Sequence, residues 1–151
     1  MLLTTMIIRT LLCRPKEIDA GEYKAREFDK DLIARHLSEA VQIPTVSMVG
    51  EFEGVDQPFY DYHAWLEKTY PLVHKTAQKT VINNYSLVYR FKGKDSSLLP
   101  GAFLAHQDVV PAPKEGWDYE PFGGTIDDGF IWGRGTQDMK GTMIYLLAAT
   151  E

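Results

Sequence analysis

The chain has 151 residues, of which 44% are hydrophobic and 12% aromatic, enough apolar material for the core of one domain. Its net charge of −5 argues against nucleic-acid binding, because contacts to phosphates need a basic surface. The single cysteine, Cys13, excludes a framework of internal disulfides and leaves the compartment open between cytoplasm and secretion.

Residues 1–21 predict an apolar leader followed by a polar linker, ahead of one domain over residues 22–151. The apolar run Met1–Cys13 is interrupted by Arg9 and is too short for a bilayer, which takes about 20 residues. Two interpretations stay open: a leader that packs or frays, and the end of a longer signal or anchor segment. A membrane anchor is therefore expected only if a longer N-terminus exists.

Two helices are predicted before the first strand. From Glu22, apolar residues at helical spacing predict a helix that ends before Pro44. After a polar loop over residues 51–57, Pro58 opens a second helix that Pro71 stops. Three histidines fall in or just after these helices, and none has a partner at ligand spacing: His36, His63 and His74. We expect His36 to be solvated, and His63 and His74 to be surface or hydrogen-bonded polar residues.

The second half of the chain predicts a sheet. Alternation over residues 85–91 predicts a strand, which makes the glycosylation sequence Asn84-Tyr85-Ser86 a chance match. The apolar run 102–105 is typical of a strand buried on both faces of a parallel sheet. Residues 125–132 predict a hairpin around Asp128-Gly129, and a helix follows Gly141. Together these elements predict an α/β fold, with a mixed, mostly parallel sheet between helices.

His106 and Asp108 directly follow the predicted strand 102–105. Alternate residues of a strand share a face, so both side chains are expected to point the same way at its carboxyl end. A neutral imidazole binds a transition metal through one nitrogen, and a carboxylate that accepts from its other N–H fixes the tautomer. The pair therefore has a use in a metal site.

Asp138 lies in a glycine-flanked turn at the predicted start of the last helix, where a carboxylate is favoured and can coordinate metal. If His106 and Asp138 converge, they form the beginning of a nitrogen-and-oxygen site of the kind that zinc accepts. Taken singly, His106 is interpreted as a hydrogen-bonded histidine and Asp138 as a turn aspartate. Two other motifs fail: Gly133-x-Gly135 lacks the third glycine of a dinucleotide site, and Met139 precedes Lys140 where a P-loop has glycine.

Residues 102–141 resemble the co-catalytic zinc peptidases that include glutamate carboxypeptidase, aminoacylase and acetylornithine deacetylase. The resemblance rests on several linked motifs in order: His106-Gln107-Asp108-Val109-Val110-Pro111, Trp117, Pro121-Phe122, Asp128-Gly129 and Gly133-Arg134-Gly135-Thr136-Gln137-Asp138-Met139-Lys140. With Ala112-Pro113 and Gly116-Trp117, the sequence is similar to the carboxypeptidase S branch, which also holds secreted N-acyl-amino-acid hydrolases.

The resemblance implies a role for each motif residue. His106 would be a terminal ligand of one zinc ion, Asp138 would bridge two zinc ions, and Asp108 would be the catalytic carboxylate that supports His106. It also implies a cis peptide bond between Asp138 and Met139. The glutamate that moves the proton, the remaining ligands, and the lid and dimerisation domain would lie beyond Glu151, so that a homodimer is possible in a longer form.

The sequence thus predicts the N-terminal part of a zinc-dependent hydrolase that cleaves an amide bond in N-acyl amino acids or small peptides. Two alternatives remain: a non-catalytic truncated product with at most weak zinc binding, and a zinc-free binding domain that keeps only the sheet. Two aromatic residues, Trp117 and Phe122, could line a pocket and are interpreted as core. Arg134 could clamp a substrate carboxylate, and we favour a role in holding its own loop through backbone carbonyls.

Overall fold

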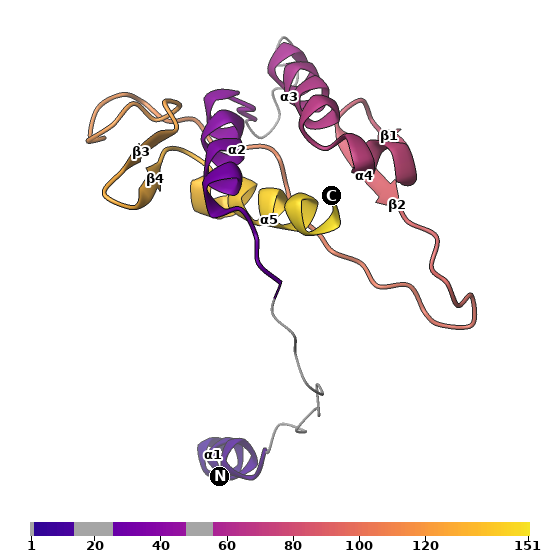
Figure 1. Ribbon diagram of the computed structural model, residues 1–151. Helices are drawn as coiled ribbons and strands as arrows, with labels where there is room; N and C mark the ends of the chain where they lie inside the picture. Colours follow the sequence, from indigo (N-terminus) through magenta and orange to yellow (C-terminus); the bar gives the residue numbers. More distant parts are fainter. Residues whose placement is uncertain (1, 14–25, 48–55) are drawn as a thin grey trace.

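The computed structural model describes residues 2–13, 26–47 and 56–151. Figure 1 shows α2 and α5 crossing at the centre, with the β3–β4 hairpin on one side and α3, α4 and the β1–β2 hairpin on the other. The elements in chain order are α1 (Leu2–Leu12), α2 (Lys30–Gln42), α3 (Asp56–Thr69), α4 (Pro71–Thr76), β1 (Gln78–Ile82), β2 (Ser86–Arg90), β3 (Thr125–Asp127), β4 (Phe130–Trp132), a π-helical turn (Thr136–Lys140) and α5 (Gly141–Thr150).

The two predicted early helices are present. The helix α2 begins after Asp29, whose side chain accepts a hydrogen bond from the backbone N–H of Leu32 at 2.9 Å, and it ends before Pro44 as predicted. The predicted start at Glu22 lies outside the described residues, but residues 26–29 are described and are not helical, so the prediction of a helix there is wrong. The helix α3 ends at Thr69, ahead of Pro71, but Pro71 then opens the short helix α4, which the sequence reading missed.

The buried core is formed where α2, α3, α4 and α5 meet. The helices contribute apolar side chains to a single cluster: Leu37, Ala40, Val41, Tyr62, Leu66, Tyr70, Val73, Ile144 and Leu147. The carboxylate of Glu151 accepts from the backbone N–H groups of Leu72 and Val73 at 3.0 and 2.9 Å, which attaches the end of α5 to the first turn of α4. These four helices therefore form the body of the described fold.

The sheets are smaller than predicted. In the described residues there are two antiparallel two-stranded sheets, β1–β2 and β3–β4, and the only parallel pairing is an isolated bridge between Val46 and Val109. The hairpin around Asp128-Gly129 is confirmed, and both turn residues have positive φ, 47° and 77°. The strand β1 was not predicted, because its residues alternate weakly.

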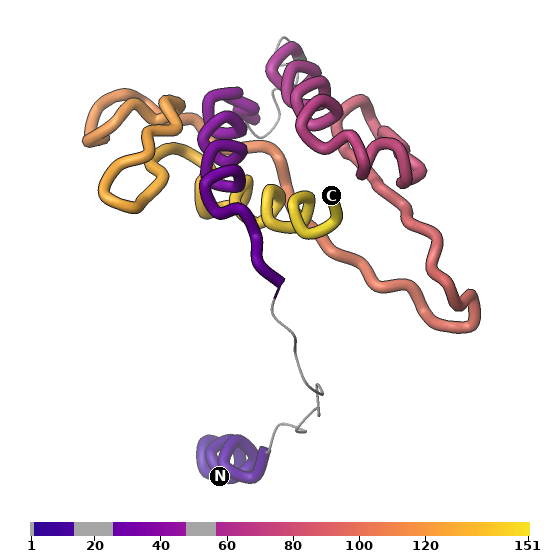
Figure 2. The backbone as a smooth tube through the Cα atoms, in the orientation of Figure 1, coloured from indigo at the N-terminus to yellow at the C-terminus, as the bar shows by residue number. Residues whose placement is uncertain are grey.

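The strand predicted over residues 85–91 is confirmed as β2, but Asn84 of the glycosylation sequence lies in the turn before it, with φ of 68° and exposed to solvent. The strand prediction for residues 102–105 is wrong. The run 102–105 is extended but pairs with no strand in the described part of the chain, and Phe103 and Leu104 are 84% and 80% exposed. Figure 2 follows this segment as it returns from the β1–β2 hairpin towards the centre of the molecule. An apolar pattern predicts burial only when a partner strand is present.

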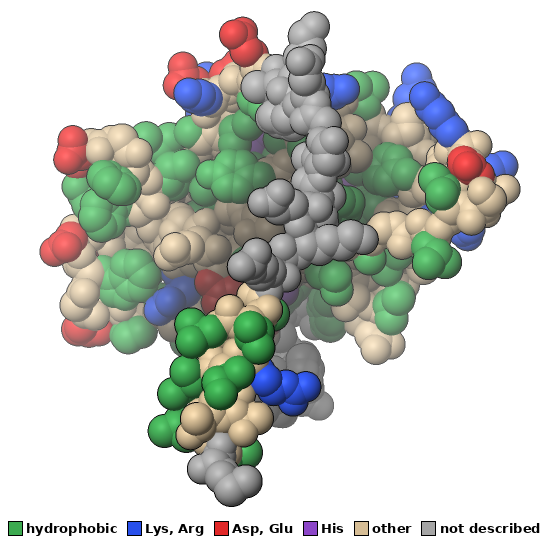
Figure 3. All heavy atoms as spheres, turned by 90° about the horizontal axis from the view of Figure 1, so that it is seen from below, with side chains coloured by type: hydrophobic (Ala, Val, Ile, Leu, Met, Phe, Trp, Pro, Cys, Tyr) green, Lys and Arg blue, Asp and Glu red, His purple; other side chains and the backbone are tan. Residues whose placement is uncertain are grey.

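The helix α1 lies apart from the body, and none of its residues is buried (Figure 1). Its apolar side chains lie on the surface, including Leu2 at 78% and Leu11 at 77% exposure, and Figure 3 shows them beneath the body of the molecule. Within the described ranges no helix combines the length and the apolar character needed to cross a bilayer.

Candidate metal centre

His106 and Asp138 meet in space although 32 residues separate them. His106 lies in the extended segment before Val109, and its Nε2 is 2.9 Å from Oδ1 of Asp138. Its Nδ1 is 2.9 Å from the backbone oxygen of Asp108 and 3.1 Å from Oδ1 of the same residue. The ring therefore has a carboxylate at each nitrogen, the arrangement that the sequence predicted from the His-x-Asp pattern.

Asp138 is presented by a tight turn ahead of α5. Gly135 precedes the turn with φ of 89°, and a Cβ at this position would lie 2.6 Å from Cγ1 of Val109, so only glycine fits. The peptide bond between Asp138 and Met139 is cis, as the resemblance implied. The Asp138 side chain is 90% exposed, which leaves its carboxylate open to a ligand from solvent.

Lys140 attaches this turn to α2. The residue is completely buried, and its Nζ donates to the backbone oxygens of Ala40 at 2.7 Å and Ile43 at 2.6 Å. Burial lowers the pKa of Lys140 to about 7. Each of these two carbonyls also accepts from a backbone N–H, Ala40 O from Ile43 and Ile43 O from Thr45, so Lys140 adds a second hydrogen bond to each. The sequence reading assigned Lys140 no structural role, although a lysine at the start of an apolar helix was the available signal.

The segment after α2 contacts the segment that carries His106 and Asp108. Residues Thr45 to Ser47 run parallel to residues 107–109, with Val109 N–H donating to Thr45 O at 2.9 Å and Ser47 N–H donating to Val109 O at 3.0 Å. The buried Thr45 hydroxyl donates to the backbone oxygen of Gln107 at 2.5 Å. The Ser47 hydroxyl donates to Oδ2 of Asp108, also at 2.5 Å. Sequence reasoning assigned these residues no chemistry, because the contact joins segments about 60 residues apart.

The electrostatics of His106 reflect its two carboxylate neighbours. Burial acts to lower the pKa of His106, but hydrogen bonds to Asp138 and Asp108, with the charges of both, raise it above its usual value. The two nitrogens of the ring therefore face different aspartates, Nδ1 towards Asp108 and Nε2 towards Asp138.

The donor set fits zinc in kind. Zinc takes imidazole nitrogen and carboxylate oxygen at about 2.0–2.2 Å, which puts two tetrahedral ligands about 3.3 Å apart. The measured 2.9 Å between Nε2 and Oδ1 needs only a small outward shift to reach that spacing. Over residues 2–13, 26–47 and 56–151 no group of three or more metal-binding side chains comes together, so the described residues offer two ligands of a site that needs more.

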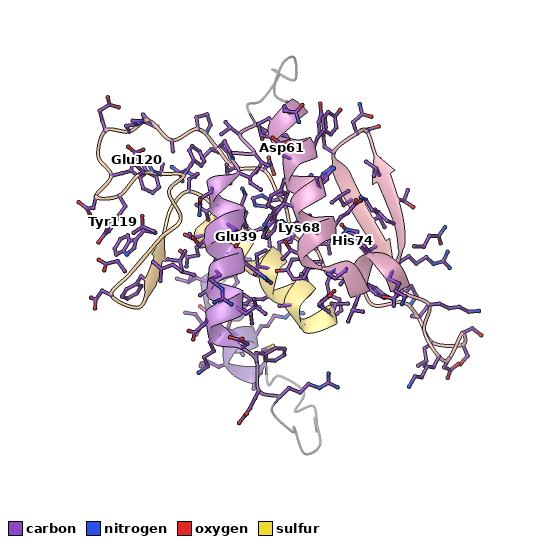
Figure 4. The ribbon with its side chains drawn as sticks, turned by 45° about the horizontal axis from the view of Figure 1, so that its top comes forward. Glu39, Asp61, Lys68, His74, Tyr119 and Glu120 are labelled. Atoms are coloured by element: carbon purple, nitrogen blue, oxygen red, sulfur yellow. The ribbon has the colours of Figure 1, made fainter. Side chains whose placement is uncertain are left out.

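The other histidines lie outside the centre. His63 and His74 are hydrogen-bonded, His63 to Tyr85 O and Gln107 at 3.1 Å, and His74 to Tyr70 O at 2.8 Å and the Tyr89 hydroxyl at 2.9 Å. Figure 4 labels His74 on α4, beside the β1–β2 hairpin. The prediction of a hydrogen-bonded role is therefore confirmed for both.

The solvated role predicted for His36 is wrong. The ring is half-buried, with its centroid 5.3 Å from that of Tyr70 and 6.3 Å from that of Trp65. Its Nδ1 is buried and has no hydrogen-bond partner in the structure. The helical pattern placed His36 among polar positions, but α3 and α4 pack against that face of α2.

The residues between the two halves of the centre are only partly buried. Trp117 and Phe122 are both half-buried, and neither belongs to the core cluster. The guanidinium of Arg134 stacks on the Trp117 ring at 5.1 Å, and its buried Nε has no hydrogen-bond partner. Figure 4 labels Tyr119 and Glu120 in the same loop, next to the β3–β4 hairpin. Arg134 holds this loop through Trp117.

Comparison with known proteins relates the chain to one family. Residues 102–151 match the model of peptidase family M20/M25/M40. The chain is 42% identical over 122 residues to "Probable carboxypeptidase S-like 2" of Dictyostelium discoideum, which covers 79% of this chain and 24% of the relative. It is 41% identical over 117 residues to the N-fatty-acyl-amino acid synthase/hydrolase of Homo sapiens, covering 76% of this chain and 23% of the relative. Carboxypeptidase S of Saccharomyces cerevisiae is 39% identical over 125 residues, covering 76% and 22%. The chain thus spans about a quarter of the length of these relatives.

Proposed function

Because residues 102–151 belong to peptidase family M20/M25/M40, we propose that the chain carries part of the metal centre of a zinc-dependent hydrolase. The reaction would be hydrolysis of an amide bond in N-acyl amino acids or small peptides. Relatives named carboxypeptidase S and N-fatty-acyl-amino acid synthase/hydrolase support both substrate classes. The observation that carries the proposal is the contact of His106 Nε2 with Asp138 Oδ1 at 2.9 Å.

Three side chains have roles in this proposal. His106 would bind one zinc ion through Nε2, and Asp138 would share its two oxygens between two ions. Asp108 keeps the proton on Nδ1 of His106 and so leaves Nε2 for the metal. When bound, a pair of zinc ions polarises a carbonyl and lowers the pKa of water, which is the chemistry that amide hydrolysis needs.

The mostly parallel sheet predicted from the sequence belongs to the same proposal. The parallel bridge between Val46 and Val109 supports it, because it lies at the position where such a sheet would bring its strands together. We also propose a homodimer for a longer form of the chain, and a membrane anchor only if a longer N-terminus exists.

Metal content and hydrolysis, measured on the protein purified from its own source, test the function. We expect bound zinc and turnover of an N-acyl amino acid in the wild-type protein, and loss of both in His106→Ala and Asp138→Ala. His74→Gln is the matched control, because His74 is a hydrogen-bonded histidine outside the centre. Unchanged zinc content and turnover in both centre variants would refute the proposal.

A non-catalytic role with at most weak zinc binding is the second candidate. It is favoured by one observation, that the described residues bring only two ligands together. This candidate predicts less than one zinc ion per chain and no turnover in the same experiment.

A further inference from the structure

The candidate centre is supported from behind by a residue that the proposed mechanism does not use. Ser47 lies just after α2, about 60 residues before Asp108, and its hydroxyl donates to Oδ2 of Asp108 at 2.5 Å. The other oxygen of the same carboxylate is 3.1 Å from Nδ1 of His106. A hydroxyl at this distance from a carboxylate makes a strong, charge-assisted hydrogen bond. Ser47, Asp108, His106 and Asp138 therefore form one continuous chain of contacts.

We propose that Ser47 is a positioning residue of this centre, which fixes the Asp108 carboxylate so that the His106 ring presents Nε2 towards Asp138. The metal-binding part of this inference rests on the proposed function, while the orientation of the ring does not. Ser47 acts through Asp108 and touches neither the expected metal nor a substrate. The backbone oxygen of Asp108, 2.9 Å from Nδ1, also holds the ring. The effect of Ser47 is on the second contact at Nδ1, because a carboxylate without the Ser47 hydrogen bond can rotate away from the ring.

The backbone around Ser47 makes this role specific to the hydroxyl. Hydrogen bonds between Thr45 and Val109 and between Ser47 and Val109 already hold the two segments together through main-chain atoms. The Thr45 hydroxyl adds a third link to Gln107. Removing the Ser47 hydroxyl therefore leaves the segments in place and removes one link of the chain, the one that reaches Asp108.

The experiment compares four variants in the metal-free protein and in zinc titrations. Ser47→Ala removes the hydroxyl and Ser47→Thr keeps it. Ser47→Val has the shape of the threonine variant without its hydroxyl, and keeps the comparison available if the alanine variant folds poorly. The matched control is Ser38→Ala, because Ser38 also lies on the α2 side and its hydroxyl donates to Gly124 O at 2.6 Å, away from His106.

The first readout is the proton on Nδ1 of His106, followed as a downfield NMR signal assigned by its absence in His106→Asn. We expect the same signal in the wild type, Ser47→Thr and Ser38→Ala. In Ser47→Ala and Ser47→Val we expect faster exchange with solvent and a smaller downfield shift, because the backbone oxygen of Asp108 is then the acceptor that remains at Nδ1. The second readout is zinc affinity by chelator competition, where loss of such outer contacts weakens binding by about 10–100-fold. Only the two variants without the hydroxyl should lose affinity.

The outcomes separate this inference from the proposed function. A signal whose shift and exchange rate are unchanged in Ser47→Val, or change equally in Ser38→Ala, would overturn the positioning role. A wild type that binds no zinc, with the NMR pattern as expected, would leave the ring orientation supported and sink the metal assignment. Equal zinc affinity in Ser47→Thr and Ser47→Val would overturn the link from Ser47 to the metal.

Discussion

The close approach of Gly135 to Val109 predicts that Gly135→Ala destabilises the fold in two separable ways. Gly135 has φ of 89°, and a side chain in left-handed backbone costs about 1–2 kcal/mol. The added Cβ would lie 2.6 Å from Cγ1 of Val109, which is only 4% exposed, and overpacking of this kind costs about 1–3 kcal/mol. The expected loss of unfolding free energy is the sum, about 2–5 kcal/mol.

A double-mutant cycle with Val109→Ala isolates the clash. Val109→Ala alone should cost about 2 kcal/mol through lost burial. The double variant should be more stable than the sum of the single effects by about 1–3 kcal/mol, because the shortened side chain makes room for the new methyl group. Unfolding in urea, followed by tryptophan fluorescence, gives all four free energies.

Gly129→Ala supplies the matched control for the backbone cost. Gly129 has φ of 77° in the β3–β4 turn, and a Cβ there would meet no atom within 4 Å. It should show the backbone penalty alone and be additive with Val109→Ala. If Gly135→Ala cost no more than Gly129→Ala, or were additive with Val109→Ala, the proposed contact between the Asp138 turn and the His106 segment would be refuted.

Three further predictions concern the buried residues Lys140 and His63 and the exposed Asn84. Lys140→Met should lower the free energy of unfolding by about 1–3 kcal/mol, since the carbonyls of Ala40 and Ile43 each lose one of their two hydrogen bonds. Urea unfolding beside the exposed Lys75→Met checks this. Burial lowers the pKa of His63 below 6.5, so the unfolded state binds more protons than the folded state just below pH 6.5. The contribution of His63 to stability should therefore be full above pH 6.5 and fall on acidification. Urea midpoints measured across pH should show this slope in the wild type and a smaller slope in His63→Gln. Expressed with a secretory signal in a eukaryotic host, the chain should gain one glycan at Asn84, which lies in an exposed turn. The glycan should appear as an increase in mass that Asn84→Gln abolishes, and an unchanged mass would contradict the prediction.

Local signals predicted the parts of the fold that local interactions determine. The Asp128-Gly129 turn is stable because of the backbone preferences of its own two residues, and the sequence located it correctly. The apolar pattern after Gly141 likewise predicted α5. The run 102–105 was misread because strand formation needs a partner strand, and periodicity in one segment carries no information about its partner.

The candidate site, too, was predicted from the sequence only in part. The residue types made His106 and Asp138 a candidate pair if they converged, and the resemblance implied that they do. The structure brings Nε2 of His106 to 2.9 Å from Oδ1 of Asp138. Their supports were not predicted, because Lys140 and Ser47 act through contacts across about 100 and 60 residues of chain. His36 was misjudged for the same reason, since its burial depends on aromatic residues from α3 and the start of α4.

The end of α2 is the element that sets the geometry of the centre. Lys140 attaches the Asp138 turn to the carbonyls of Ala40 and Ile43, while Ser47, a few residues later, attaches the carboxylate behind His106. His106 and Asp138, 32 residues apart in the chain, are thus both attached near the end of α2, Asp138 through its last turn and His106 through the segment that follows it. A change that shifts Ser47 relative to the last turn of α2 should therefore move His106 and Asp138 relative to each other, even though neither residue belongs to α2.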